Sequence, residues 1–350
     1  MRVAITGATG NVGTSLLRSL AGEAEVHEIL GIARRRPEVS FDKTTWVAAD
    51  VAKDDLRAVF EGCDAVVHLA WLIQPSRDES VTHGVNVDGS KRVFEAAADA
   101  GVRNIIYASS IGAYSPAPIG TVVDESWPTH GVPTSFYSRH KAAVERILDT
   151  FAARHPNVRI VRLRPGLIFK AEAASGIRRL FAGPLLPPWI TAPSRLPLIP
   201  HIPGLTLQAV HSDDVADAYR RALVTDVSGA FNVAAEPVLD TGLIARALGK
   251  RTIRVPANVV RRLALVTWKL RLQPTPPGWL DLGMQGPVMD TTAVRARLGW
   301  EARVSALDAL AELLEGLARS AGGPTPPLHP HAGGPLRIRE WLTGVGRRSR

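Results

Sequence analysis

At 350 residues and a formal net charge of +9, the chain is long enough to bury one large core or two modest ones. Its composition, 45% hydrophobic and 21% charged, is ordinary for a globular protein. The single cysteine, Cys63, excludes an internal disulfide and a thiolate metal cluster, and it favours a reducing cytoplasm.

The start of the chain and its hydropathy pattern predict a cytoplasmic protein without a membrane span. "MRVAITGATG" lacks the charged start and long apolar run of a signal peptide. No uninterrupted apolar stretch reaches the roughly eighteen residues that cross a bilayer. The positive charge lies in separate stretches such as "GIARRRP" and "GRRSR", without interleaved aromatics or finger spacing, so nucleic acid is not expected. The charge favours a small anionic ligand instead.

Apolar β-rich runs alternate with helical patterns over residues 1–170. Strands are predicted at 2–6, 28–33, 46–50, 65–70, 104–109 and 159–165. Helices are predicted between them, at 13–22, 55–62, 89–101 and 137–155. This alternation predicts an α/β fold of the Rossmann type, a doubly wound parallel sheet with helices on both faces.

The segment 183–204 interrupts this pattern with seven prolines and cannot form a regular helix or a central strand. Its apolar residues, among them Leu185, Leu186 and Trp189, need something to cover. We therefore predict a semi-rigid lid over a substrate. A dimer contact or plain surface packing is the alternative, so a homodimer stays open.

One more strand, helix and strand are predicted over 207–223 and 229–235, followed by mostly helical patterning to residue 319. The chain thus divides into a nucleotide-binding domain, 1–170 plus 206–236, and a smaller, mostly helical substrate-binding region, 171–205 plus 237–320. Residues 321–350 are rich in Pro and Gly and basic, which predicts an arm or a partly disordered tail.

Three glycines follow the first predicted strand and open the first predicted helix, in "RVAITGATGNVG". Gly7 permits a tight turn, Gly10 lets the backbone approach a pyrophosphate, and Gly13 allows close packing of the helix. The helix N-terminus then presents free N–H groups to the phosphates. Because the strand and the amphipathic helix are both present, the motif predicts dinucleotide binding.

The second predicted strand ends in Arg34, Arg35 and Arg36, where a cofactor with a free ribose 2′-hydroxyl is usually held by an acidic residue. A guanidinium can pair with a 2′-phosphate through two hydrogen bonds. The arginines therefore favour NADP(H) as the cofactor, and NAD(H) remains the alternative. A solvated basic turn is the alternative.

Tyr137 and Lys141 lie four residues apart in "SFYSRHKAAVE", so a helix would place both on one face. This spacing is common by chance and gains weight only from the rest of the chain. The stretches "TGATGNVG", "HLA", "VNVDGS", "YASS", "YSRHK" and "RPG" occur in the order and spacing of the short-chain dehydrogenase/reductase superfamily. With "VHSDDVA", the chain resembles its extended branch, the NAD-dependent epimerase/dehydratase family, over about residues 1–235.

The resemblance implies that Tyr137 is the acid/base and that the charge of Lys141 lowers its pKa. Ser110 would hold the substrate oxygen, with Ser109 as the fallback. His211 in "VHSDDVA" is interpreted as structural. The residues expected to contact the cofactor are Gly7, Thr9, Gly10, Asn11, Val12, Gly13, Arg34, Arg35, Asp50, Val51, Leu69, Ala70, Asn86, Ser109, Tyr137, Lys141, Pro165, Gly166 and Leu167. For Asn86 a structural role in its helix is an equal alternative.

The chain departs from the nucleotide-sugar members of the family. Where the dehydratases carry an Asp-Glu pair, this chain has Ile111 and Gly112, which cannot move a proton. "RPGLIFK" also lacks the Asn and Tyr-Gly-Pro that often follow in those members. The expected substrate residues are Trp71, Phe169, Arg178 and Trp189. No cluster with metal-ligand spacing is seen.

Three functions remain open from the sequence. The first is an oxidoreductase that interconverts a carbonyl and an alcohol on a largely apolar small molecule. The second is an epimerase acting on a sugar or nucleotide sugar. The third is a non-catalytic module that senses NADP(H). The complete Ser/Tyr/Lys set argues against the sensor, and the missing acidic pair favours the first function over the second.

Overall fold

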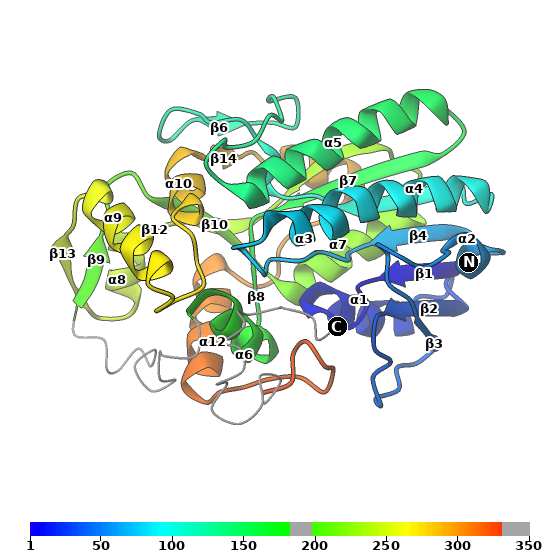
Figure 1. Cartoon of the computed structure of the whole chain (residues 1–350), viewed down its shortest axis with the longest axis horizontal. Helices are drawn as coiled ribbons and strands as arrows, with labels where there is room; N and C mark the ends of the chain where they lie inside the picture. Colours follow the sequence, from blue (N-terminus) through cyan, green and yellow to red (C-terminus); the bar gives the residue numbers. More distant parts are fainter. Residues whose placement is uncertain (183–197, 331–350) are drawn as a thin grey trace.

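The computed structural model describes residues 1–182 and 198–330 (Figure 1). The β-rich runs of the N-terminal part form one parallel seven-stranded sheet in the order β11-β7-β5-β4-β1-β2-β3. Its strands are β1 (Arg2–Thr6), β2 (Glu28–Ala33), β3 (Thr44–Ala48), β4 (Ala65–His68), β5 (Asn104–Ala108), β7 (Arg159–Pro165) and β11 (Gly229–Val233). The strand order reverses between β1 and β4, and in such sheets ligands bind in the crevice at that point. The predicted fold class is confirmed.

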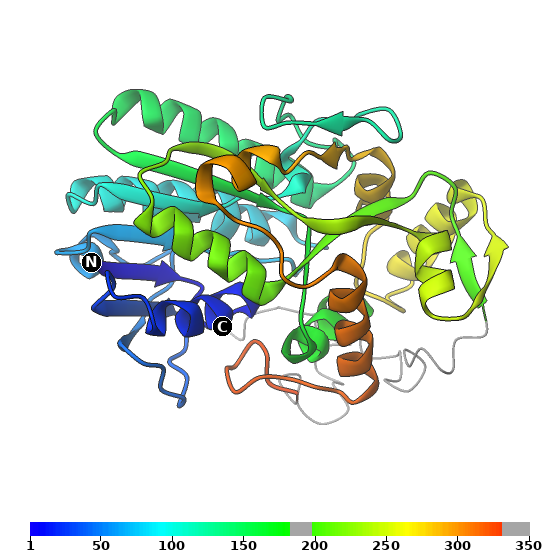
Figure 2. The same cartoon turned by 180° about the vertical axis from the view of Figure 1, so that it is seen from behind.

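Helices cover both faces of this sheet. Figure 1 shows α4 (Gly89–Asp99) and α5 (Phe136–Arg154) on one face, and Figure 2 shows α7 (Ser212–Val224) on the other. The N-terminal helix α1 (Asn11–Ala21) packs against α7. Apolar side chains of both layers are fully buried against the strands, including Leu16, Phe94 and Phe151. The alternation of strands and helices therefore predicted the layers of the fold correctly. The strand predicted at 46–50 begins two residues earlier, as β3.

Shorter elements complete the N-terminal part. These are α2 (Arg57–Phe60), α3 (Glu79–His83), the π-helical turn η1 (Gly84–Asp88), the 3₁₀ turn η2 (Ile111–Ala113) and β6 (Val122–Val123). The turn η2 directly follows β5 at the carboxyl end of the sheet. It therefore lies at the edge where the crevice opens.

A second, three-stranded sheet branches from the first. It consists of β8 (Leu167–Phe169), β10 (Thr206–His211) and β12 (Ala235–Asp240), in the order β12-β10-β8. The strand predicted near residue 207 is thus real but does not join the main sheet. Gly166 makes the branch possible, because a Cβ there would lie 2.4 Å from the carbonyl oxygen of Gln208.

The C-terminal part is mostly helical. It contains α8 (Thr241–Ala247), α9 (Ala257–Lys269), α10 (Gly278–Gln285), α11 (Thr292–Leu298) and α12 (Ala306–Ala318). Short parallel pairs join β9 (Leu198–His201) to β13 (Arg251–Arg254) and β14 (Val288–Met289) to β6. After β8 the chain forms η3 (Ala171–Ala173), α6 (Ala174–Ile177) and η4 (Arg178–Ala182). No helix in the described ranges has both the length and the apolar composition needed to span a bilayer.

The described residues of the predicted tail, 321–330, include side chains that pack on the rest of the protein. Thr325 is fully buried and its hydroxyl donates a hydrogen bond to the carbonyl oxygen of Thr9, at 2.7 Å. Leu328 is buried as well. The prolines and glycines of this stretch therefore shape a turn that packs on the glycine-rich loop. Residues 331–350 and residues 183–197 of the predicted lid, with Trp189, lie outside the described residues. The remaining lid residues, 198–204, begin with β9.

Candidate active site

The glycine-rich loop between β1 and α1 has the close packing that its sequence predicts. Gly7 has a φ of +73°, and a Cβ there would lie 2.7 Å from the backbone nitrogen of Ala70. A Cβ at Gly13 would lie 2.5 Å from the carbonyl oxygen of Ala8. Both positions therefore require glycine, and they bring the N-terminus of α1 against the ends of β1 and β4. The first N–H groups of a helix have no intrahelical partner and are available to an anion.

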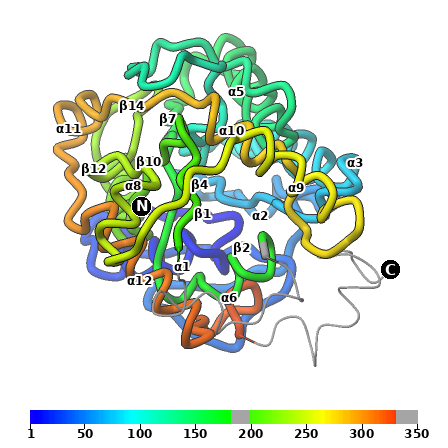
Figure 3. Tube along the Cα trace, turned by 90° about the vertical axis from the view of Figure 1, so that its left-hand side faces the viewer, coloured from blue at the N-terminus to red at the C-terminus, as the bar shows by residue number. Residues whose placement is uncertain are grey.

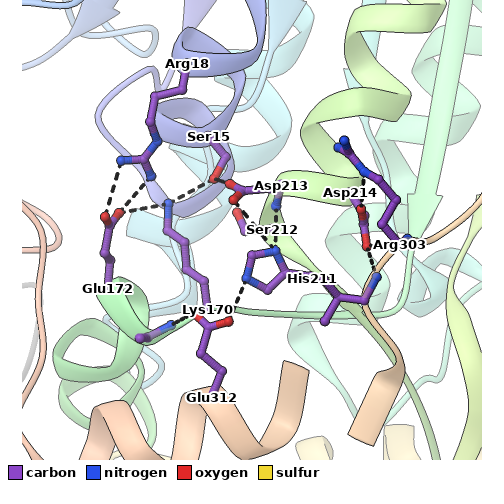
Figure 4. Close-up of polar contacts among 12 residues, drawn as sticks. Ser15, Arg18, Lys170, Glu172, His211, Ser212, Asp213, Asp214, Arg303 and Glu312 are labelled. Atoms are coloured by element: carbon purple, nitrogen blue, oxygen red, sulfur yellow. Dashed lines mark hydrogen bonds and ion pairs between the residues drawn. The ribbon is translucent and has the colours of Figure 1, made fainter. Parts of the chain in front are cut away.

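A buried lysine that the sequence analysis did not single out holds the first turn of α1 from below (Figure 4). Lys170 Nζ donates to the carbonyl oxygen of Asn11 at 2.9 Å and to the hydroxyls of Thr14 and Ser15 at 2.9 and 3.1 Å. Burial lowers its pKa to about 8, although Glu172 nearby opposes the shift. In the sequence Lys170 is a single lysine directly after "RPGLIF", and no motif includes it.

The same network joins α1 to the C-terminal part. Arg18 pairs with Glu172 at 2.8 Å, and the Ser15 hydroxyl donates to Asp213 at 2.5 Å. His211 caps α7, where its Nδ1 accepts from the backbone N–H of Asp213, and its Nε2 lies 3.1 Å from Glu312 of α12. Figure 4 shows these side chains converging between α1, α7 and α12. His211 therefore has the kind of position that a structural role requires.

The predicted catalytic side chains meet at the carboxyl end of β5. Ser135 caps α5, which places Tyr137 and Lys141 in its first two turns. Ser110 begins the turn η2, and its Oγ accepts a hydrogen bond from the backbone N–H of Gly112 at 3.0 Å. The Ser110 side chain also lies beside Tyr137, where it acts to lower the pKa of the phenol. The three residues thus come together although 31 positions separate Ser110 from Lys141 (141 − 110 = 31).

Lys141 is almost fully buried under an aromatic ring. Its Nζ donates to the carbonyl oxygen of Ala108 at 2.6 Å and lies 3.5 Å from the centre of the Trp71 ring. Burial lowers the pKa of Lys141 well below its usual value, and the charge of Glu145 opposes this only in part. The indole of Trp71 therefore screens the amine from solvent and stabilises its charged form by a cation–π contact.

Burial, not the neighbouring lysine, dominates the titration of Tyr137. It raises the pKa of the phenol to about 12, and the neighbouring Ser110 side chain acts in the opposite direction. Lys141 Nζ lies 5.8 Å from the centre of the Tyr137 ring. The expectation that Lys141 brings this pKa towards neutrality is therefore wrong for this structure, because the desolvation of the phenolate is the larger effect.

Glu145, one turn beyond Lys141, anchors α5 to β7. Its carboxylate pairs with Arg164 through two hydrogen bonds of 2.9 and 3.1 Å and with Arg162 at 2.8 Å. Burial alone would raise the pKa of Glu145, but these guanidinium groups hold it below its usual value. Ser109 donates to the same carboxylate at 2.5 Å. The Ser109 hydroxyl is therefore committed to this ion cluster, and Ser110 is the serine beside Tyr137.

Asn86 is fully buried and shapes the loop that carries Trp71. Its side chain accepts from the backbone N–H of Leu72 at 2.7 Å and donates to the carbonyl oxygen of Leu72 at 2.8 Å. Beside it, His68 bridges Thr6 and Ser90 at 2.7 and 2.8 Å. Asn86 therefore has a positioning role towards the loop over Lys141.

Aromatic rings form walls around Tyr137. Trp279 of α10 packs at 4.8 Å between ring centres, Trp71 packs edge-on at 5.9 Å, and Phe181 contacts Trp279 at 5.0 Å. Sequence analysis missed Trp279 and Phe181, which lie far from any motif. A Cβ at Gly112 would lie 2.8 Å from Cε1 of Tyr137, so a side chain at this position would displace the ring.

The other predicted residues line the same edge of the sheet or flank it. Arg34 and Arg35 are exposed directly after β2. Val51 is buried, and the Asp50 carboxylate accepts from the backbone N–H of Ala52 at 3.1 Å. Leu69, Ala70, Pro165, Gly166 and Leu167 follow or end β4 and β7, Phe169 ends β8, and Arg178 begins η4.

Comparison with known proteins gives one family and several distant relatives. The NAD dependent epimerase/dehydratase family matches residues 3–234. The uncharacterized protein Rv2047c of Mycobacterium tuberculosis is 29% identical over 304 residues, which are 86% of this chain but 28% of that protein. This chain therefore spans little more than a quarter of that relative's length.

Two further proteins extend the comparison. L-arabinose 1-dehydrogenase (NAD(P)(+)) of Haloferax volcanii is 32% identical over 184 residues, covering 49% of this chain and 68% of the relative. The solved structure of MoeE5 in complex with UDP-glucuronic acid and NAD has a TM-score of 0.67 at 21% identity, covering 91% of this chain and all of MoeE5. At that identity the likeness shows the fold alone.

Proposed function

This chain belongs to the NAD-dependent epimerase/dehydratase family, and we propose that within it the protein is an NADP(H)-dependent oxidoreductase acting on a largely apolar carbonyl or alcohol. One observation carries the proposal. Tyr137, with Ser110 beside it, lies against the rings of Trp71 and Trp279, and the positions after Ser110 are Ile111 and Gly112, which carry no acidic side chain. Such a site suits an oxygen atom on an otherwise apolar molecule.

The residues that would hold the cofactor fit a dinucleotide. Gly7 and Gly13 allow the close packing that brings the N-terminus of α1 to the end of the sheet. Gly10, the N-cap of α1, has no side chain that would keep a pyrophosphate from the free N–H groups of the helix. Lys170 and Thr325 brace this loop from behind. The nicotinamide ring, when bound, supplies or accepts the hydride. Arg34 and Arg35 lie where a ribose 2′-phosphate would be recognised, which favours NADP(H).

The side chains then divide the work at the substrate oxygen. Because burial raises its pKa to about 12, Tyr137 is protonated at neutral pH and can donate its phenolic proton to a carbonyl oxygen. Ser110 holds that oxygen and orients the phenol. In its protonated form Lys141, fixed on the Ala108 carbonyl, places positive charge behind the phenolate that forms. The aromatic walls exclude water, which strengthens each of these interactions.

Epimerisation of a nucleotide sugar is the second candidate. The similar structure of MoeE5 was solved in complex with UDP-glucuronic acid and NAD, which supports this second candidate. The walls of Trp71, Phe181 and Trp279 offer few charged groups to a sugar, which favours the first candidate.

Incubation of the protein with NADPH and a panel of apolar ketones and aldehydes tests the proposal. We expect net loss of NADPH absorbance with at least one compound and an alcohol product in equal amount. Isomerised sugar without net cofactor oxidation would support the epimerase instead. No turnover of any kind, together with tight NADPH binding, would support the sensor and contradict the proposal.

A further inference from the structure

The segment from residue 250 to residue 272 is strongly basic. It contains seven Lys and Arg and no Asp or Glu. It comprises β13, α9 and the three residues that follow α9, and Figure 1 shows β13 and α9 at one end of the long axis. Figure 3 looks onto that end of the molecule. We call this region the α9 surface.

Exposed apolar side chains gather on the same surface. Along α9 and its C-cap, Val259, Leu263, Val266 and Leu270 are 51%, 63%, 52% and 65% exposed. Their spacing of i, i+4, i+7 and i+11 places them on one face of the helix. Ile253, Leu272 and Leu198 add to this group, so that seven of the eleven exposed large hydrophobic residues of the described chain lie here.

The opposite face of α9 holds the helix to the protein. Arg261 pairs with Asp281 of α10 through hydrogen bonds of 2.8 and 3.0 Å. Trp268 Nε1 lies 3.4 Å from the hydroxyl of Ser76, and the guanidinium of Arg77 lies 4.6 Å from the centre of the Trp268 ring. Arg261 and Trp268 are seven residues apart and share a face turned away from Leu263. The apolar stripe is therefore oriented outward by contacts on the other side.

From these observations we propose that the α9 surface docks onto an anionic lipid bilayer, with the apolar stripe in the interface and the flanking cations on the headgroups. A helix with an apolar face and a Lys/Arg-rich polar face lies in the plane of such an interface. Arg262 and Lys269 flank the stripe, and Arg251, Arg254 and Arg271 extend the charge.

A second copy of the chain fits this surface less well. A two-fold contact through the α9 surface would bring the outward-facing cations of two copies together, and like charges across an interface are costly. Anionic headgroups instead neutralise these charges, and each Lys or Arg near the headgroups raises the binding constant by about fivefold. Charge complementarity therefore selects the bilayer as the partner.

Docking would also position the candidate active site. Asp281, which holds α9, lies on α10 two residues after Trp279. Ser76 and Arg77 follow the loop that carries Trp71. Both aromatic walls of the site are thus attached to the helix that would lie on the bilayer. The idea that an apolar substrate enters from the lipid rests on the proposed function. Docking of the α9 surface does not depend on that function and is tested without an activity assay.

Flotation of the full chain with lipid vesicles tests the proposal. We expect binding to phosphatidylcholine vesicles containing about 30 mol% phosphatidylglycerol, weaker binding to phosphatidylcholine alone, and loss of binding as salt is raised. The variant Leu263→Ser/Leu270→Ser should bind at least tenfold more weakly. Its control is Ile119→Ser/Val122→Ser, two side chains that are 66% and 63% exposed on another face and should bind like the wild type.

A charge variant completes the test. Arg262→Gln/Lys269→Gln should lose roughly twentyfold in binding to anionic vesicles, from two cations of about fivefold each. Arg146→Gln/Arg154→Gln, on the exposed face of α5, should change little. Failure of the wild type to float, or binding that neither α9 variant weakens, would overturn the proposal. Self-association in sedimentation that Leu263→Ser/Leu270→Ser abolishes, without flotation, would make this surface an interface between copies.

Discussion

The helices α5 and α9 belong to the same molecule but are built on opposite plans. α5 buries nine residues, among them Lys141 and Glu145, and its polar side chains pair inside the protein. α9 buries none, and its large apolar side chains face outward. The first helix is fixed by a desolvated ion cluster with Arg164. The second is held by a half-exposed ion pair with Asp281 and by contacts of Trp268. The proposed catalytic residues thus lie on a helix with many buried side chains, and the proposed docking surface lies on a helix with none.

The largest expected effect contrasts the two ion pairs directly. Glu145→Gln should lower the free energy of unfolding by about 3–5 kcal/mol, because it leaves the buried guanidinium of Arg164 without its charge partner. Asp281→Asn should cost about 1 kcal/mol or less, since its partner Arg261 is 44% exposed. Urea unfolding of both variants measures the difference. Equal losses would show that the C-terminal part is held as tightly as the sheet.

The next effect concerns the proton at the substrate oxygen. Tyr137→Phe keeps the ring against Trp279 but removes the phenolic hydroxyl beside Ser110. We expect kcat to fall by about a hundredfold, the usual scale for a general acid, with cofactor affinity unchanged. Steady-state kinetics and calorimetry separate the two quantities. Near-normal turnover would remove Tyr137 from the mechanism.

A buried histidine should make the N-terminal part sensitive to acid. Burial, with a smaller effect of the Lys141 charge, lowers the pKa of His68 from 6.5 to about 3. Between these values the unfolded chain binds more protons than the folded one, so stability is lost as the pH falls below 6.5. From pH 7.5 to pH 5 the loss from His68 is about 2 kcal/mol. His140, with a pKa lowered to about 4 by burial, acts in the same sense.

Unfolding of His68→Gln and of the wild type at both pH values measures this contribution. The variant should lose less stability than the wild type between pH 7.5 and pH 5. The exposed His130→Gln is the matched control and should follow the wild type. Parallel profiles for all three proteins would show that His68 is solvated or paired in its charged form.

The smallest expected effect lies on an exposed part of the N-terminal region. Arg34→Ser/Arg35→Ser should weaken NADP+ binding by about tenfold, the value of one charge-assisted contact at the surface, and leave NAD+ binding unchanged. Calorimetric titration with both cofactors gives the ratio, with Arg146→Ser as the control. Tighter binding of NAD+ than of NADP+ by the wild type would show that the two arginines form a solvated turn and do not contact the cofactor.

The sequence by itself determined the sheet and the order of its helices, because the spacing of apolar residues within each segment indicates a strand or a helix. It also predicted Gly7, Gly13, Ser110, Tyr137 and Lys141 as site residues, since each lies in a motif of a few adjacent residues. Those residues need only the ends of neighbouring strands to bring them together, and a doubly wound sheet supplies that edge.

Only the tertiary structure decided what surrounds these residues. Trp279 and Lys170 reach the site from segments far along the chain, so no local pattern marks them. The titration of Tyr137 was misjudged for the same reason, since desolvation depends on everything that packs around a phenol and not on its spacing from a lysine. The outward apolar face of α9 likewise resembles an ordinary core stripe in sequence, and only the absence of buried residues in the folded helix distinguishes it.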